Sequence, residues 1–266
     1  MGIVINNLSH KYNNKNNSIN NITMELFDNK IYGIIGKSGS GKTTLLELID
    51  GLLKPTTGKI IVNETNDIKK IRKQIGFVFQ FPEEQFFEEN VKKEVEFSAK
   101  NFKIKNKKVN EVLKLVGLSE SYLHKNLYEL SNGEKRLIAI ASILIYNPKI
   151  ILLDEPTIGL DYKNKKKILR IINLLKNKCN KTIIIVSHDI DFIYKICDDL
   201  IVIDKGSLIM YGDCDSVFKE KELIDKYKID IPKVIKFEEL VKIKKNIKLM
   251  HSTSVNDLIK EVYRNV

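Results

Sequence analysis

The octapeptide GKSGSGKT, Gly36–Thr43, is the stretch of sequence that decides the predicted fold. It fits the pattern G-x-x-x-x-G-K-[ST], and it lies between an apolar stretch, Ile31–Ile35, and a helical pattern, Thr44–Ile49. A strand, a glycine-rich turn and a helix in this order direct backbone N–H groups and the positive end of a helix dipole at one point. The segment therefore predicts a phosphate-binding loop in an α/β domain.

The residues of this loop have different expected roles. Its glycines let the backbone approach a phosphate without a Cβ in the way. We expect Lys42 to reach the β- and γ-phosphates of a nucleotide and the Thr43 hydroxyl to ligate Mg²⁺. A chance match in a lysine-rich chain is the alternative, and the strand and helix around the loop argue against it. The residues expected to contact the nucleotide here are Gly36, Lys37, Ser38, Gly39, Ser40, Gly41, Lys42, Thr43 and Thr44.

The composition argues against recognition of nucleic acid, although the net charge of the 266-residue chain is +11. Only four of its 45 basic residues are arginines, and the lysines are spread along the chain among acidic residues. Because arginine dominates the recognition of bases and the bidentate recognition of phosphates, a bias in composition explains the charge better than a binding surface does. We therefore expect no nucleic-acid partner.

The sequence contains no run that approaches the roughly 18 apolar residues of a membrane span, and residues 1–6 lack the basic region of a signal peptide. Any membrane role is therefore expected to depend on a partner. The three cysteines, Cys179, Cys197 and Cys214, are far apart and show no metal-ligand spacing. This pattern predicts a reduced, cytosolic protein.

Two carboxylates follow a fully apolar stretch, Ile150–Leu153, which must be covered on both faces and therefore belongs in the middle of a parallel sheet. Ligands of open α/β sheets bind at the carboxyl ends of such strands. We expect Asp154 to hold Mg²⁺ and Glu155 to act as the general base on the attacking water. A solvated helix start is the structural alternative for this pair.

Three further polar or aromatic residues stand at the ends of predicted strands. His188 follows the buried stretch Thr182–Val186, which places it within reach of a γ-phosphate if the two strands are neighbours. Gln80 follows Ile75–Phe79. Tyr12 ends the first strand, where an aromatic ring stacks on adenine or belongs to the core.

The order of these motifs resembles that of the ATP-binding cassette (ABC) ATPases. The resemblance spans about residues 2–212 and implies a P-loop NTPase fold with an antiparallel β subdomain and a helical subdomain at about 82–146. Residues 1–214 would form this nucleotide-binding domain and residues 215–266 a C-terminal helical appendage. The motifs that carry it are Tyr12, Gly36–Thr43, Gln80, Leu130–Glu134, Ile151–Glu155, Gly159–Asp161 and His188.

The resemblance implies a head-to-tail dimer that binds two ATP molecules with Mg²⁺ at its interface. It gives Glu155, His188 and Gln80 catalytic roles, and it makes Thr43, Gln80 and Asp154 the metal-binding residues. Ser131, Asn132, Gly133 and Glu134 would act on the nucleotide of the partner subunit. From the residues alone, Ser131 and Glu134 are a helix N-cap and its capping box.

Within that family, the segment Phe79–Val91 is similar to its counterpart in the ATPases of energy-coupling factor (ECF) transporters. This similarity implies a second ABC ATPase subunit, an integral membrane coupling subunit and a substrate-binding membrane subunit. The chain would then be a peripheral protein on the cytoplasmic face of the cell membrane and would power import of vitamins or transition-metal ions. The ATPase of another ABC transporter, for ions, peptides or drugs, and a soluble non-transport ABC ATPase are the alternatives.

Other nucleotide-binding classes fit less well. A GTPase requires the guanine motif N-K-x-D, which the sequence lacks. Only 89 positions separate Lys42 from Ser131, too few for the coiled coil of a DNA-repair or chromosome-organising ABC ATPase. Translation-associated ABC proteins usually carry two cassettes, and this chain has one.

Three residues depart from the family pattern. Asn132 replaces a glycine, Glu134 a glutamine, and Tyr162 a proline. Asparagine tolerates a left-handed backbone, but Glu134 is expected to place a negative charge near the partner's γ-phosphate. We therefore expect a heterodimer in which the site completed by this chain is the slower of the two.

Overall fold

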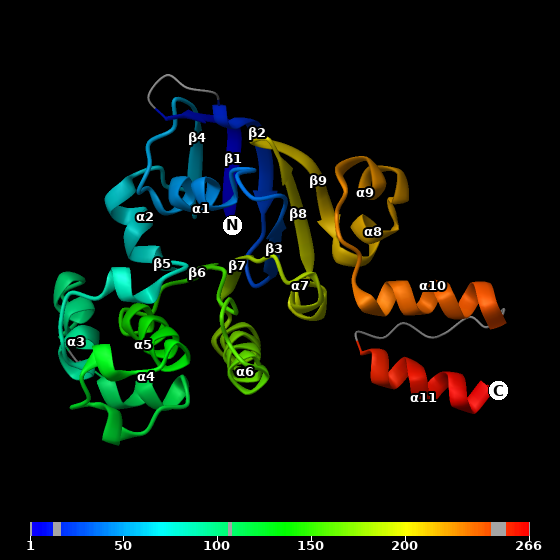
Figure 1. Ribbon diagram of the computed structural model, residues 1–266. Helices are drawn as coiled ribbons and strands as arrows, with labels where there is room; N and C mark the ends of the chain where they lie inside the picture. The colour runs from blue at the N-terminus through cyan, green and yellow to red at the C-terminus, as the bar shows by residue number, and fades with distance from the viewer. Residues whose placement is uncertain (1, 13–16, 106–107, 246–253, 266) are drawn as a thin grey trace.

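The computed structural model describes residues 2–12, 17–105, 108–245 and 254–265, which form two sheets with helices around them (Figure 1). The smaller sheet is antiparallel, in the order β2-β1-β4. The larger has the order β5-β6-β7-β3-β8-β9, and all its pairings are parallel except that of β8 with β9. The strands are β1 (Ile3–Lys11), β2 (Asn17–Leu26), β3 (Ile31–Ile35), β4 (Thr57–Val62), β5 (Ile75–Val78), β6 (Ile150–Asp154), β7 (Thr182–Val186), β8 (Asp199–Asp204) and β9 (Ser207–Asp213).

Strand β6 shows why the parallel strands lie in the interior. Every residue of β3, β6 and β7 is buried. Since side chains alternate across a strand, Ile151 and Leu153 enter one core cluster, and Ile150 and Leu152 enter the other. The expectation of a doubly covered central strand is confirmed, and so is that of an α/β fold with a separate antiparallel sheet.

Helices cover both faces of the larger sheet. Helix α1 and the antiparallel sheet contribute to one core cluster, and α5, α6 and α7 contribute to the other. The first seven helices are α1 (Lys42–Asp50), α2 (Ile68–Gln74), α3 (Val91–Asn101), α4 (Val109–Leu115), α5 (Asn132–Leu144), α6 (Tyr162–Cys179) and α7 (Ile190–Ile196), with short 3-10 turns η1 (Pro82–Gln85), η2 (Glu120–Tyr122) and η3 (Leu127–Glu129).

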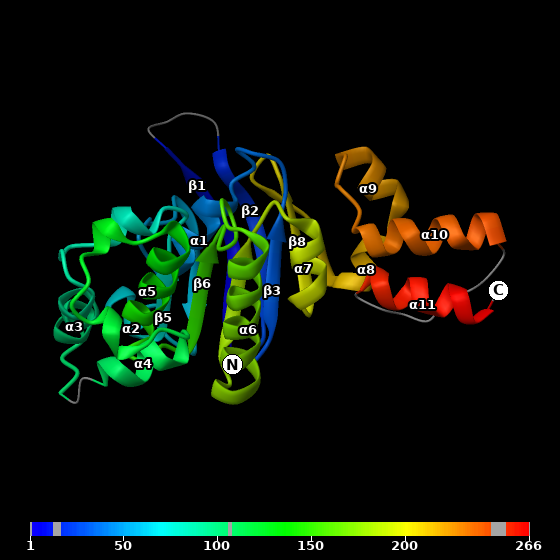
Figure 2. The same cartoon turned by 60° about the horizontal axis from the view of Figure 1, so that its bottom comes forward.

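Two groups of helices flank the sheets on opposite sides (Figure 2). Helices α3, α4 and α5 gather beside β5, and the C-terminal helices follow the edge strand β9. The latter are α8 (Cys214–Lys219), α9 (Lys221–Tyr227), α10 (Lys233–Lys245) and α11 (Val255–Asn265). Within the described ranges, the helices all fall short of the length and apolar character needed to cross a membrane.

Candidate functional site

A cavity of about 400 Å³ lies over the carboxyl ends of the parallel strands. The loop after β3 and the residues that follow β6 and β7 meet there because parallel neighbours end at the same edge of a sheet. The cavity is lined by Tyr12, Ser18, Ser38, Gly39, Gly41, Lys42, Thr43, Thr44, Gln80, Asp154, Glu155, Val186 and His188.

The loop between β3 and α1 needs glycine at two positions. Gly36 has φ 154°, and a Cβ there would lie 2.1 Å from the carbonyl oxygen of Ile203. Gly41, with φ 103°, would place a Cβ 2.5 Å from the carbonyl oxygen of Ser18. The loop backbone therefore passes too close to these carbonyl oxygens for any side chain, just before the N-terminus of α1. The first backbone N–H groups of that helix have no partner within the helix. The loop is therefore shaped to receive an anion.

Lys42 is held inside this loop. Its side chain is buried, and its ammonium group donates to the carbonyl oxygens of Gly36 and Lys37 at 2.9 Å each. Burial lowers the pKa of Lys42, while the nearby carboxylates of Glu155 and Asp154 raise it. The ammonium group thus lies at the wall of the cavity with its orientation already set.

Two side chains with oxygen atoms that suit a hard cation lie next to each other in the cavity lining. The Thr43 hydroxyl donates to Oδ2 of Asp154 at 2.7 Å. Burial raises the pKa of Asp154, and the hydrogen bond from Thr43 opposes that rise. The described residues hold no cluster of three or more His, Cys, Asp or Glu side chains that could bind a metal alone. Thr43 and Asp154 therefore fit an ion such as Mg²⁺, which is commonly held by one or two carboxylates together with substrate phosphates.

Glu155 lies beside them with only 6% of its surface exposed. Its Oε2 accepts the backbone N–H of His188 at 3.3 Å, and its Oε1 lies 3.5 Å from Nε2 of His188. Burial, and then the charge of Asp154, raise the pKa of Glu155, whereas burial and Lys42 lower the pKa of His188. A buried carboxylate with a raised pKa next to a neutral imidazole is suited to accept a proton from water.

Tyr12 stands at the mouth of the cavity with 44% of its surface exposed. Its ring meets that of His10 edge-on, with the centroids 4.8 Å apart. Its hydroxyl donates to Oε2 of Glu47 at 3.2 Å, on helix α1. The ring is thus held by its contact with His10 and by the hydrogen bond of its hydroxyl, and it remains partly exposed at the mouth of the cavity.

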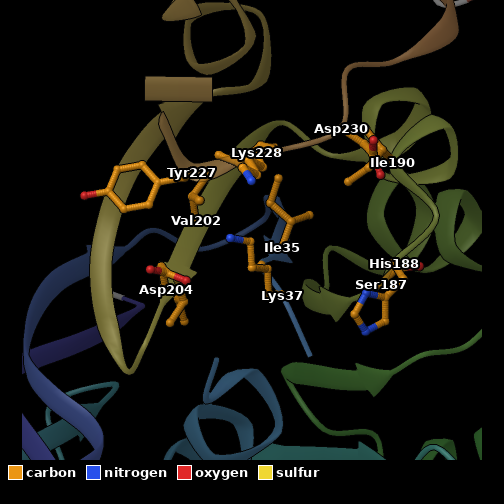
Figure 3. A pocket seen from close by; sticks show the side chains of 13 residues that line it. Ile35, Lys37, Ser187, His188, Ile190, Val202, Asp204, Tyr227, Lys228 and Asp230 are labelled. Carbon is orange, nitrogen blue, oxygen red and sulfur yellow. The ribbon is translucent and has the colours of Figure 1, made fainter. Parts of the chain in front are cut away.

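Three residues predicted for this site belong to the same loop but are not among those that line the main cavity. Gly36 and Lys37 line a second cavity, of about 140 Å³. Figure 3 labels Lys37 and His188 among the side chains of that cavity. His188 borders both cavities. Ser40 is buried within the loop. Sequence reasoning missed Ser18 and Val186 in the main cavity, because neither belongs to a recognisable motif.

Comparison with known proteins shows the family of this chain. The model of the ABC transporter family matches residues 19–158. The energy-coupling factor transporter ATP-binding protein EcfA2 of Staphylococcus epidermidis is 39% identical over 242 residues, 86% of this chain and 85% of that protein. EcfA2 of Clostridium perfringens is 41% identical over 249 residues, 88% of this chain and 87% of that protein. The chain belongs to the ABC transporter ATPases of the energy-coupling factor type.

Solved structures agree with this assignment. CbiO1 of Clostridium perfringens, part of the ABC transporter complex CbiONQ, matches with a TM-score of 0.75 and 33% identity over 89% of this chain and 98% of that chain. A dimeric ATP-binding cassette in a post-hydrolysis state, bound to ADP and Pi, matches with a TM-score of 0.72 and 29% identity over 79% of this chain and 98% of that chain. This ABC ATPase therefore binds ATP and energises transport, as the sequence predicted.

The segment expected to act on the partner's nucleotide, Ser131–Glu134, lies apart from the cavity. None of Ser131, Asn132, Gly133 and Glu134, all within the described part of the chain, belongs to the cavity lining. Ser131 is the N-cap of α5 and forms a capping box with Glu134, as predicted from the residues. Asn132 is the first helical residue, so its tolerance of a left-handed backbone is not used. A Cβ at Gly133 would lie 3.0 Å from the side chain of Asn164 on α6.

Arg136, to which the sequence assigned no role, connects helix α5 to the cavity wall. Arg136 of α5 is 3% exposed, and its guanidinium donates to the carbonyl oxygen of Phe79, next to Gln80, at 3.3 Å. Burial lowers the pKa of Arg136, and the charges of Glu83, Asp154 and Glu155 oppose that shift. No sequence motif marks Arg136, because it is a single basic residue on an otherwise apolar helix face.

Proposed function

We propose that this ABC ATPase hydrolyses Mg²⁺-ATP and thereby powers import of a vitamin or transition-metal ion through an ECF-type membrane complex. The observation that carries the proposal is the convergence of Lys42, Thr43, Asp154, Glu155 and His188 on one cavity. Similarity to EcfA2 proteins over most of the chain supports the ECF assignment.

The roles of the cavity residues follow from their chemistry. Lys42 and the N–H groups of the loop hold the triphosphate, and Tyr12 holds the base. Thr43 and Asp154, with Gln80, hold Mg²⁺, which neutralises charge on the phosphates. Glu155 accepts the proton of the attacking water, and His188 lies where it can donate to a γ-phosphate.

We assign residues 1–214 to the nucleotide-binding domain, with a helical subdomain at about 82–146, and residues 215–266 to an appendage. The partners are a second ABC ATPase subunit, an integral membrane coupling subunit and a substrate-binding membrane subunit. The chain then resides on the cytoplasmic face of the cell membrane as a peripheral subunit. Dimers among similar cassettes support the first of these partners.

The acidic and aromatic segment at 83–89 is our candidate for the surface that docks the coupling subunit. Phe87 is 76% exposed and stacks on Phe97 with the centroids 4.9 Å apart, beside a groove of about 260 Å³. Buried Glu94 accepts the backbone N–H groups of Phe87 and Glu88 at 2.9 and 3.0 Å and so holds the segment in place. Phe86 instead packs against the core.

Co-purification tests the proposed function. The tagged chain is isolated from detergent-solubilised membranes, and the proteins that accompany it are identified by mass spectrometry. We expect a second ATPase subunit and two integral membrane proteins, and ATP turnover that rises when this complex is reconstituted in lipid. Recovery of the chain without any membrane protein would refute the transport assignment.

A further inference from the structure

The carboxylate of Glu134 is bonded on both of its oxygens within its own subunit. Oε2 accepts the hydroxyl of Ser131 at 2.8 Å and the backbone N–H of Ser131 at 2.9 Å. Oε1 accepts the hydroxyl of Tyr122, at the end of η2, at 2.5 Å. The sequence pattern predicted the capping box but not Tyr122, which lies twelve residues upstream.

These bonds occupy the only proton of the Ser131 hydroxyl. A serine hydroxyl has one donor hydrogen, and an ionised carboxylate can only accept. Here Ser131 accepts the backbone N–H of Glu134 at 3.3 Å and donates to Glu134 Oε2. The hydroxyl therefore cannot donate to an outside phosphate until its bond to Oε2 opens.

The hydroxyl of Tyr122 restrains the second oxygen of the carboxylate, Oε1. Its hydrogen bond is the largest of the contributions that lower the pKa of Glu134 to about 2, so the group is ionised at physiological pH. Lys125 lies 3.8 Å from the centroid of the Tyr122 ring, where a cation–π contact favours the observed ring position. The negative charge is thus balanced by groups on the segment before α5.

We infer that Tyr122 is a positioning residue that holds the Glu134 carboxylate within its own subunit, so that Ser131 can turn to the partner's nucleotide without the carboxylate following it. This inference rests on the proposed head-to-tail dimer. If the Tyr122 hydroxyl is lost, only Ser131 holds the carboxylate, through Oε2. When the Ser131 hydroxyl turns to the partner's nucleotide, the carboxylate can then follow it towards the triphosphate, where like charges repel strongly in a site closed to water. A glutamine at 134 carries no charge and can itself donate, so it has no need of Tyr122.

A double-mutant cycle separates this role from a structural one. Its four members are the parent chain, Tyr122→Phe, Glu134→Gln, and the chain with both changes. All carry Glu155→Gln, which silences this chain's own site, and each is paired with the second ATPase subunit recovered in the complex. Tyr128→Phe, at a 66% exposed tyrosine of the same segment, is the matched control.

The readouts are the remaining ATP turnover, which reports the partner's site, and the ATP-dependent association of the pair, which needs no hydrolysis. We expect Tyr122→Phe to lower kcat/KM about three- to tenfold, and to weaken association to a similar degree, when residue 134 is glutamate. With Glu134→Gln we expect the same change to alter either quantity less than about twofold. Tyr128→Phe should leave both unchanged.

Equal effects of Tyr122→Phe in the two backgrounds would overturn the inference, since a residue that only supports the fold acts regardless of the charge at 134. No effect in either background would overturn it as well. Thermal unfolding of each member shows whether the fold is intact. Failure of the chain to associate with any ATPase subunit would refute the proposed function, and this inference with it.

Discussion

Replacement of Glu155 by glutamine tests the catalytic assignment most directly. The carboxylate is nearly buried, accepts the N–H of His188 at 3.3 Å, and lies on a backbone with φ 47°. Glutamine has the same shape, keeps one oxygen for the His188 N–H, and tolerates this backbone as well as glutamate does. We therefore expect the variant to fold and to bind ATP.

The expected loss lies in the rate. A positioned general base contributes about 10²–10⁴ in rate, which corresponds to about 3–5 kcal/mol in the activation free energy. Stability should not fall, and the sign follows from the pKa. Because burial and Asp154 raise the pKa of Glu155, the folded state disfavours its charge, and a neutral amide removes that cost at neutral pH.

Phosphate release at saturating Mg²⁺-ATP and equilibrium binding of a fluorescent ATP analogue measure the two quantities separately. Lys42→Ala is the contrasting variant, and we expect it to lose binding, because it removes the ammonium group held at the loop by two 2.9 Å hydrogen bonds. We expect Glu155→Gln to retain ATP. Turnover near the wild-type rate in that variant would show that another group is the base.

Three further outcomes follow from the same structure. Charge reversal at Glu83 and Glu84 should reduce recovery of the membrane subunits and leave ATP binding intact; unchanged recovery would exclude the docking role. Burial raises the pKa of Asp50 from 3.8 to about 6. Ionisation of Asp50 therefore lowers the free energy of unfolding by an amount that grows between these two pKa values and is complete above the higher one. Asp50→Asn should therefore raise the free energy of unfolding in urea by about 3 kcal/mol at pH 8 and by about a third of that at pH 4.5, whereas equal gains would contradict the assignment. In the reconstituted pair, Glu155→Gln in this chain should remove most turnover and the equivalent change in the partner should leave a substantial part; equal losses would argue against unequal sites.

The local sequence was sufficient to predict those features that are formed by residues close together along the chain. The loop from Gly36 to Thr43, the strand that ends in Asp154 and the capping box at Ser131 are each encoded within ten residues. The strand order was not available from periodicity, because β3 pairs with β7, about 150 residues away. Only the resemblance of the whole motif series predicted that fold.

Residues that act across the fold were missed for the same reason. Ser18 enters the cavity because β2 passes under the glycine loop, and no pattern around it indicates a ligand. Tyr122 reaches Glu134 from a separate 3-10 turn. The expectation that Glu134 faces the partner's phosphate considered its charge but not the hydrogen bonds that hold it. Its unfavourable effect there remains a prediction, which now depends on those bonds opening.

Helix α5 connects the two nucleotide sites that a head-to-tail dimer would have. Ser131 caps its N-terminus, and one turn later Arg136 donates to Phe79, the residue before Gln80 in the cavity wall. A helix is stiff over so short a distance, and a buried guanidinium is costly to leave unpaired. We therefore expect a shift of α5 to displace Ser131 and the segment at Gln80 together. The proposed docking segment begins three residues after Gln80. If a membrane partner binds and moves it, we expect the movement to act both on this chain's own site and on the site that this chain completes.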